Sequence, residues 1–160
     1  MGKKEKYKTF LQVAGLLNRR YKITPVLYGS LGLQKCIGGD FEINDIDILV
    51  PQKYLKELWP DLQKLMIELG YCLSNEHEHE FSKDGETVAF GRIKGLDNEA
   101  KVDSSKLKVE SEDGARFMVL QSEDYRKAYE YCLKDGYCRA KRGAADQQKI
   151  DLIYRYLDEW

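Results

Sequence analysis

The sequence predicts an α+β fold in which one mixed β-sheet is flanked by helices, with further helices at the C-terminal end. Segments with helical spacing of apolar residues lie at both ends of the chain, and short strand-like segments separated by turn residues lie in its middle. The 160 residues contain no internal repeat and no low-complexity linker. We therefore expect a single domain over residues 1–160, with the sheet-containing core over about 1–120 and C-terminal helices over about 122–160.

The first part of the chain is expected to alternate helices and short strands. The predicted order is helix, strand, helix, strand and helix, over residues 4–20, 24–29, 30–36, 45–50 and 55–69. Ser30 is suited to capping the second helix. Pro60 is expected to bend or break the third helix, and Gly70 to close it.

The middle of the chain reads as a series of short strands, followed by two helices. The predicted strands are 71–74, 77–81, 87–93, 100–105, 107–111 and 116–120. The turn "KDGE" is expected to join two of them as a hairpin. A helix is predicted from Ser122 to near Gly136, and a last one from about Ala140 with Ile150, Ile153, Tyr154 and Leu157 on one face.

Composition narrows the class of function. With 26 basic and 27 acidic residues the formal net charge is −1, which argues against a duplex nucleic acid as partner and favours a small substrate. Nothing resembles a signal peptide, and no apolar run reaches the roughly 20 residues that span a bilayer. The four cysteines show no CxxC spacing. We expect a cytoplasmic protein without a membrane partner.

One predicted strand carries an unusual pair of acids. Alternate residues of a strand share a face, so Asp45 and Asp47 point one way, about 6.5–7 Å apart, while Ile46, Ile48 and Val50 point toward the core. Mg²⁺ is usually held by one or two carboxylates together with waters and substrate phosphates. The pair indicates a metal site, although an Asp-x-Asp on a solvated sheet face is the simpler alternative.

A Gly-Ser pair precedes this strand. Gly29 at the end of a strand would let backbone amides approach a phosphate, and Ser30 would add a hydroxyl at the positive end of a helix dipole. Gly-Ser also occurs often by chance. In the order strand, Gly-Ser, helix, turn and strand with Asp-x-Asp, the two motifs are more specific together and predict a site for a nucleoside triphosphate with Mg²⁺.

The stretches "LYGSLGL" and "NDIDILV" resemble the nucleotidyltransferase superfamily, which includes DNA polymerase β, the poly(A) polymerases and the small antibiotic nucleotidyltransferases. The signature of that superfamily is Gly-Ser followed by Asp-x-Asp on the next strand, with a third carboxylate from a later strand. The resemblance covers roughly the first two-thirds of this chain, and the type is nearest to the bacterial lincosamide and aminoglycoside enzymes. The connection between the two motifs is longer here than is usual and contains Gly-Gly.

The resemblance implies a role for particular residues. Gly29 and Ser30 would bind the triphosphate, and Asp45, Asp47 and Asp103 would hold two Mg²⁺ ions. Asp103 could instead act as the general base on the acceptor hydroxyl.

Other residues could complete this site. In related enzymes basic residues of the helical part reach the triphosphate, which would be Lys141 here. Glu78 and Glu80 are rivals of the third aspartate, and only the strand order decides between them. His77 and His79 are expected on one face of the same strand, as solvent-facing residues or as part of a substrate pocket; a metal site is a further alternative, but no other His or Cys completes a ligand set.

Three functions follow from these expectations. The first is Mg²⁺-dependent transfer of a nucleoside monophosphate from a triphosphate such as ATP to a hydroxyl of a small molecule, for instance an antibiotic or aminosugar. The second is a non-catalytic nucleotide-binding or interaction module, such as an antitoxin-type partner. The third is nucleotidyl transfer to a protein. A homodimer could complete the acceptor site. Asp146 falls on the inner face of the last helix, where it would need a basic partner; the alternative is a partly exposed aspartate near the positive end of the helix dipole.

Overall fold

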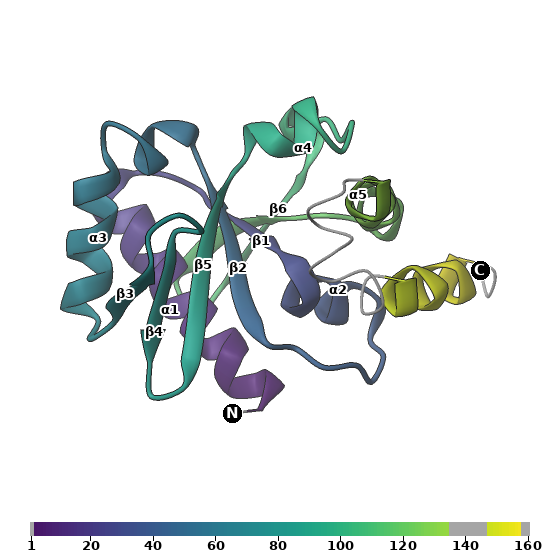
Figure 1. Cartoon of the computed structure of the whole chain (residues 1–160), viewed down its shortest axis with the longest axis horizontal. Coiled ribbons are helices and arrows are strands. Elements are labelled where there is room, and N and C mark those ends of the chain that lie inside the picture. The colour runs from purple at the N-terminus through teal and green to yellow at the C-terminus, as the bar shows by residue number, and fades with distance from the viewer. Residues whose placement is uncertain (1, 135–146, 158–160) are drawn as a thin grey trace.

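A computed structural model describes residues 2–134 and 147–157 of the chain. Its centre is a seven-stranded sheet with the strand order β3-β4-β5-β2-β1-β7-β6 (Figure 1). The strands are β1 (Val26–Tyr28), β2 (Asp45–Val50), β3 (Cys72–Asn75), β4 (Glu80–Lys83), β5 (Glu86–Arg92), β6 (Lys108–Glu112) and β7 (Ala115–Val119).

Helices and helical turns connect these strands. They are α1 (Lys3–Tyr21), α2 (Gly29–Ile37), the 3₁₀ turn η1 (Gln52–Leu55), α3 (Trp59–Glu68), α4 (Lys94–Asn98), the 3₁₀ turn η2 (Ser104–Lys106), α5 (Ser122–Lys134) and a helix over 147–157. No helix within residues 2–134 or 147–157 is both long and apolar enough to cross a membrane.

The sheet is mixed, which confirms the predicted α+β class. Strands β1 and β2 are antiparallel, whereas β2 pairs in parallel with β5 and β1 with β7. The hairpins β3–β4, β4–β5 and β6–β7 are antiparallel. The predicted turn "KDGE" makes the β4–β5 hairpin through Asp84 and Gly85, both of which have positive φ, as a tight hairpin turn requires.

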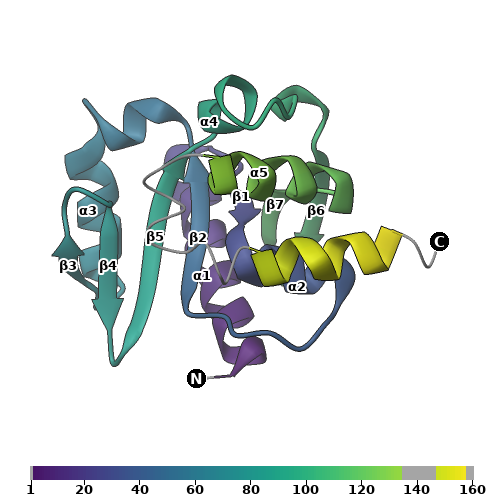
Figure 2. The same ribbon diagram turned by 45° about the vertical axis from the view of Figure 1, so that its right-hand side comes forward.

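Helices cover the two faces of the sheet at different places. In both views α1 lies behind the sheet. In Figure 2 α5 lies in front of the β1–β7–β6 end, and the helix 147–157 lies in front of α2. Helix α1 buries its apolar face against β7, where Phe10 and Phe117 meet edge to face with ring centroids 5.1 Å apart. Ile46 and Ile48 of β2 are 0% exposed. The aspartates of β2 therefore project from the opposite face, as the alternation predicted.

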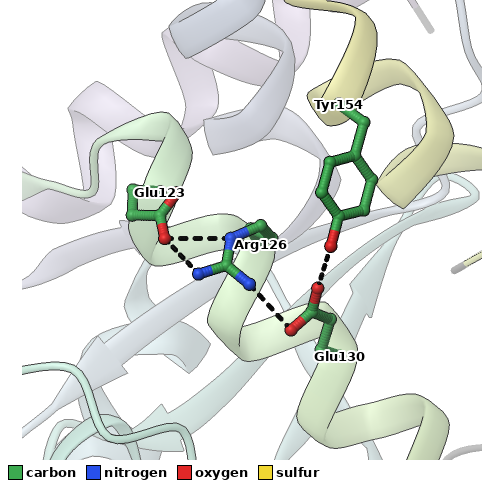
Figure 3. A network of polar contacts seen from close by, with 4 residues as sticks. All are labelled: Glu123, Arg126, Glu130 and Tyr154. Atoms are coloured by element: carbon green, nitrogen blue, oxygen red, sulfur yellow. Dashed lines mark hydrogen bonds and ion pairs between the residues drawn. The ribbon is translucent and has the colours of Figure 1, made fainter. Parts of the chain in front are cut away.

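A polar network ties the helix 147–157 to α5 (Figure 3). Arg126 donates hydrogen bonds to the carboxylates of Glu123 and Glu130, each with a 2.9 Å contact. Tyr154 donates its hydroxyl proton to the other oxygen of Glu130. These bonds lower the pKa of both glutamates. Ile150 and Ile153 are buried as predicted, whereas Tyr154, predicted on the same face, is 43% exposed.

One helix start differs from the prediction, and one helix is broken as predicted. Helix α2 begins at Gly29 with Tyr28 in the capping position, so Ser30 lies in the first turn and is not the cap. The helix predicted over 55–69 is broken just before Pro60, as expected: η1 ends at Leu55 and α3 begins at Trp59. Pro60 lies in the first turn of α3, where the N–H that proline lacks would be unbonded in any case. Gly70 has φ +90° directly after the helix, as predicted.

Of the predicted strands, 77–81 is displaced, because β4 begins at Glu80, and 100–105 is absent. Residues 76–79 form the turn between β3 and β4, where His79 has φ +53°, so His77 and His79 do not share a strand face. The segment 100–105 contains no strand: Val102 is buried, but the chain then enters η2. The sequence also gave no sign of α4, a helix of only five residues. The predicted end near Gly136 and start near Ala140 lie outside the described residues.

Candidate functional site

Gly29 of the Gly-Ser motif lies directly against Asp47 of β2. In the β1–β2 ladder Tyr28 pairs with Asp47, and the chain turns at Gly29 into α2. Gly29 has φ +67°, and a β-carbon on it would lie 2.0 Å from Oδ2 and 2.8 Å from Cγ of Asp47. No side chain fits in that space, because real β-carbons essentially never come within 3.0 Å of such atoms. The backbone of the first turn of α2 thus lies against the carboxylate.

The start of α2 is suited to an anion. The helix has nine residues, and its cap residue Tyr28 makes no side-chain hydrogen bond to the first turn. Backbone N–H groups at a helix start carry partial positive charge and bind phosphates readily. The site therefore combines an anion-binding helix start with a carboxylate in contact with it.

The position of α2 is fixed by a buried tyrosine of α5. Tyr125 is 1% exposed, and its hydroxyl donates a 3.4 Å hydrogen bond to the carbonyl of Leu27. A β-carbon on Gly32 would lie 2.1 Å from that hydroxyl. Burial raises the pKa of Tyr125 well above its ordinary value, and the nearby Asp47 contributes to the rise. The contact holds α2 on the ends of β1 and β2.

The sheet face beside the aspartates carries small residues. Asp45 and Asp47 are both half-buried. On the adjacent strand β5 they pair with Thr87 and Ala89, which share their face. No acid therefore stands next to the pair on β5. Asp45 and Asp47 provide two carboxylates of the kind that Mg²⁺ binds together with waters and phosphate oxygens, so this donor set fits Mg²⁺ held partly by a substrate.

Asp103 lies in a different setting from the one expected. It precedes η2, and its Oδ1 accepts hydrogen bonds from the backbone N–H and the hydroxyl of Ser105, at 3.0 and 2.6 Å. These bonds lower the pKa of Asp103. Within residues 2–134 and 147–157, no three His, Cys, Asp or Glu side chains are grouped so that they could hold a metal ion. A metal-binding role for Asp103 stays a prediction.

The strand order separates the two rivals for the third carboxylate. Glu80 is in β4 and pairs with Ala89, which in turn pairs with Asp47. Glu78 lies in the turn that precedes β4, where its backbone N–H bonds the side chain of Asn75 at 3.2 Å. Glu80 therefore shares the sheet face of Asp47, one strand beyond Ala89.

The remaining predicted residues fall into two groups. His79 packs its ring edge-on against Trp59, with centroids 4.6 Å apart, and is part of an aromatic contact at the β3–β4 turn. Lys141 and Asp146 lie outside the described residues.

Sequence reasoning missed Tyr28, which shares the face of Asp47 and stacks on Tyr125 with ring centroids 6.2 Å apart. Only the register of the β1–β2 pair shows that Tyr28 lies beside Asp47.

The described chain is thus an α+β protein with a paired-aspartate site at a helix start. No protein-family model matches it. Uncharacterized protein YnaI of Bacillus subtilis (strain 168) is 39% identical to it over 151 residues, which make up 94% of this chain and 97% of YnaI. The chain therefore belongs to the YnaI family.

A solved structure overlaps coarsely with the chain. The crystal structure of ANT(2″)-Ia in complex with adenylyl-2″-tobramycin covers 98% of both chains with a TM-score of 0.49 and 11% identity.

Proposed function

We propose that this protein is a Mg²⁺-dependent nucleotidyltransferase that moves a nucleoside monophosphate from a nucleoside triphosphate to a hydroxyl of a small molecule. The observation that carries the proposal is the contact between Gly29 and Asp47. It joins a phosphate-binding helix start to a carboxylate that can hold a cation, and a triphosphate with Mg²⁺ needs both within a few ångströms of each other.

Each part of the site has a task in this reaction. The first turn of α2, with Ser30, would bind and orient the phosphates. Asp45 and Asp47 would hold Mg²⁺. The metal, when bound, would offset charge on the triphosphate and on the departing pyrophosphate. Holding both reactants on the sheet face lowers the barrier by fixing the acceptor oxygen near the α-phosphorus.

Isothermal titration with each common nucleoside triphosphate, with and without Mg²⁺, tests the proposal. The wild type should bind one or more of them only when Mg²⁺ is present. Asp47→Asn keeps the shape of the side chain but removes its charge, so we expect at least about tenfold weaker binding. Asp113→Asn, in the β6–β7 turn, removes one negative charge far along the chain from the site and should bind as the wild type does. Equal affinity of the two variants would contradict the proposal.

One observation favours a second function, a nucleotide-binding module without transfer. Ala89 of β5 pairs with Asp47, at the position where an acid on the next strand would give a third carboxylate. Asp103 accepts hydrogen bonds from Ser105 at η2. A binding module would show the same Mg²⁺-dependent titration but would release no pyrophosphate. Measuring pyrophosphate from the bound triphosphate therefore separates the two functions.

A further inference from the structure

Strand β6 is the outermost strand at one end of the sheet, beyond β7 (Figure 2). Within residues 2–134 and 147–157, no strand pairs with its outer side. Four of its five residues are exposed, and among them Val109 is a large apolar side chain that is 44% exposed. The unpaired edge of a strand presents N–H and C=O groups to which a second strand can bond.

The hairpin turn determines which backbone groups of β6 point outward. Strands β6 and β7 are joined by a two-residue turn, 113–114, in which both residues have positive φ. Such a turn closes on a hydrogen-bonded pair, so the backbone of Glu112 bonds to β7. Bonded and non-bonded pairs alternate along an antiparallel ladder. The backbone groups of Val109 and Ser111 therefore point away from β7, toward the free side.

The charges of β6 follow a fixed order along the strand. Lys108 begins it, and Glu110 and Glu112 follow on the same face of the sheet. The side chain of Lys108 is 67% exposed, and its Nζ lies 3.9 Å from the carboxylate of Glu110. In an antiparallel second copy this order is reversed, so a lysine of one copy can lie opposite a glutamate of the other. Opposite charges on paired strands stabilise the pairing.

The charges select one register for such a pair. Two antiparallel copies of β6 are related by a two-fold axis that passes through one residue of the strand. An axis through Lys108, Glu110 or Glu112 places that charged residue opposite its own copy. An axis through Ser111 places Glu110 opposite Glu112. Only an axis through Val109 avoids like charges within the strand, and it places Lys108 opposite Glu110 twice.

We propose that β6 is a dimer interface, in which it pairs in the antiparallel sense with β6 of a second copy of this chain, with Val109 on the two-fold axis. Lys108 and Glu110 of the two copies then form a ring of four charges of alternating sign on one face of the joined sheet. On the other face the two exposed valines cover each other. The outward backbone groups of Val109 meet those of its copy, which makes a hydrogen-bonded pair. This inference does not depend on the proposed function.

Charged residues on an edge strand often prevent pairing, and here their order determines which partner is accepted. Parallel pairing in register would place Lys108 opposite Lys108 and Glu110 opposite Glu110. The shifted antiparallel registers also place like charges opposite one another. The charge order is complementary to itself in a single arrangement, so the partner that fits is a second copy of β6.

Analytical ultracentrifugation of the full chain over a range of protein concentrations tests the proposal. The wild type should form dimers. Lys108→Glu and Glu110→Lys each place like charges opposite one another at two points, so each should raise the dimer dissociation constant about tenfold or more. An equimolar mixture of these two variants should dimerise as the wild type does, because lysine and glutamate again lie opposite one another at both points. The double variant Lys108→Glu/Glu110→Lys should also dimerise, for the same reason.

A charge reversal elsewhere is the matched control. Lys56 is exposed and lies just before α3, which contacts β3 at the opposite end of the sheet. Lys56→Glu should keep the wild-type dissociation constant, and circular dichroism should show that every variant is folded. A wild type that stays monomeric at all concentrations overturns the inference. So does a dimer that neither single variant weakens, which would place the contact elsewhere, and so does a mixture of the two folded variants that stays monomeric.

Discussion

Replacing Gly29 by alanine should disturb both the fold and the site, and a second glycine provides the control. Gly29 has φ +67°, a conformation that costs an alanine about 1–2 kcal/mol. The new methyl would also lie 2.0 Å from Oδ2 of Asp47, so the carboxylate or the helix start must move. Overpacking of this kind costs about 1–3 kcal/mol more. Gly114, with φ +80° and no atom within 4 Å of an added β-carbon, should lose only the first contribution.

Urea unfolding followed by circular dichroism measures the difference. We expect Gly114→Ala to lower the free energy of unfolding by about 1–2 kcal/mol and Gly29→Ala by about 2–5 kcal/mol. If the two variants lose the same amount, the contact with Asp47 does not constrain the fold and the reasoning is refuted.

Nucleotide binding gives the second half of this test. Gly29→Ala places a methyl group between the first turn of α2 and Asp47, so Mg²⁺-dependent triphosphate binding should be lost at a temperature at which the variant is still folded. Gly114→Ala lies in the β6–β7 turn and should bind as the wild type does. Normal binding by a folded Gly29→Ala protein would mean that phosphates bind elsewhere.

Two further predictions concern stability. Glu86 is 3% exposed, its Oε1 has no hydrogen-bond partner, and burial raises its pKa. Because the folded state binds the proton of Glu86 more tightly, the free energy of unfolding should fall as the pH rises from the ordinary glutamate pKa through the raised value. Urea unfolding of Glu86→Gln across that pH range should show a smaller fall. Tyr154→Phe removes the hydrogen bond to Glu130, so amide exchange in residues 147–157 should become roughly two- to tenfold faster. Unchanged exchange would show that apolar packing alone holds this helix in place.

The sequence correctly predicted those elements in which the spacing of apolar residues and the residues at the two ends indicate the same boundaries. The predicted range of β2 matches the observed Asp45–Val50, because alternation and Pro51 define both the faces and the end. The prediction failed at 76–79 and 100–105, where a positive φ at His79 and the 3₁₀ turn after Asp103 interrupt the extended chain. Both segments were predicted as strands, but local hydrogen bonds to the side chains of Asn75 and Asp103 stabilise turns instead.

The site shows the same limit more sharply. A local motif could place Gly29 beside Asp47, because β1 and β2 are consecutive strands that pair directly, with only α2 and the connection 38–44 between them. It could not choose among Asp103, Glu78 and Glu80, since that choice depends on which strands are neighbours. Strand β2 pairs in parallel with β5, and β5 pairs antiparallel with β4. These two pairings place Glu80 in the same row as Asp47. Long-range register, which a single sequence does not encode in any short pattern, therefore decides where a second carboxylate faces the paired aspartates.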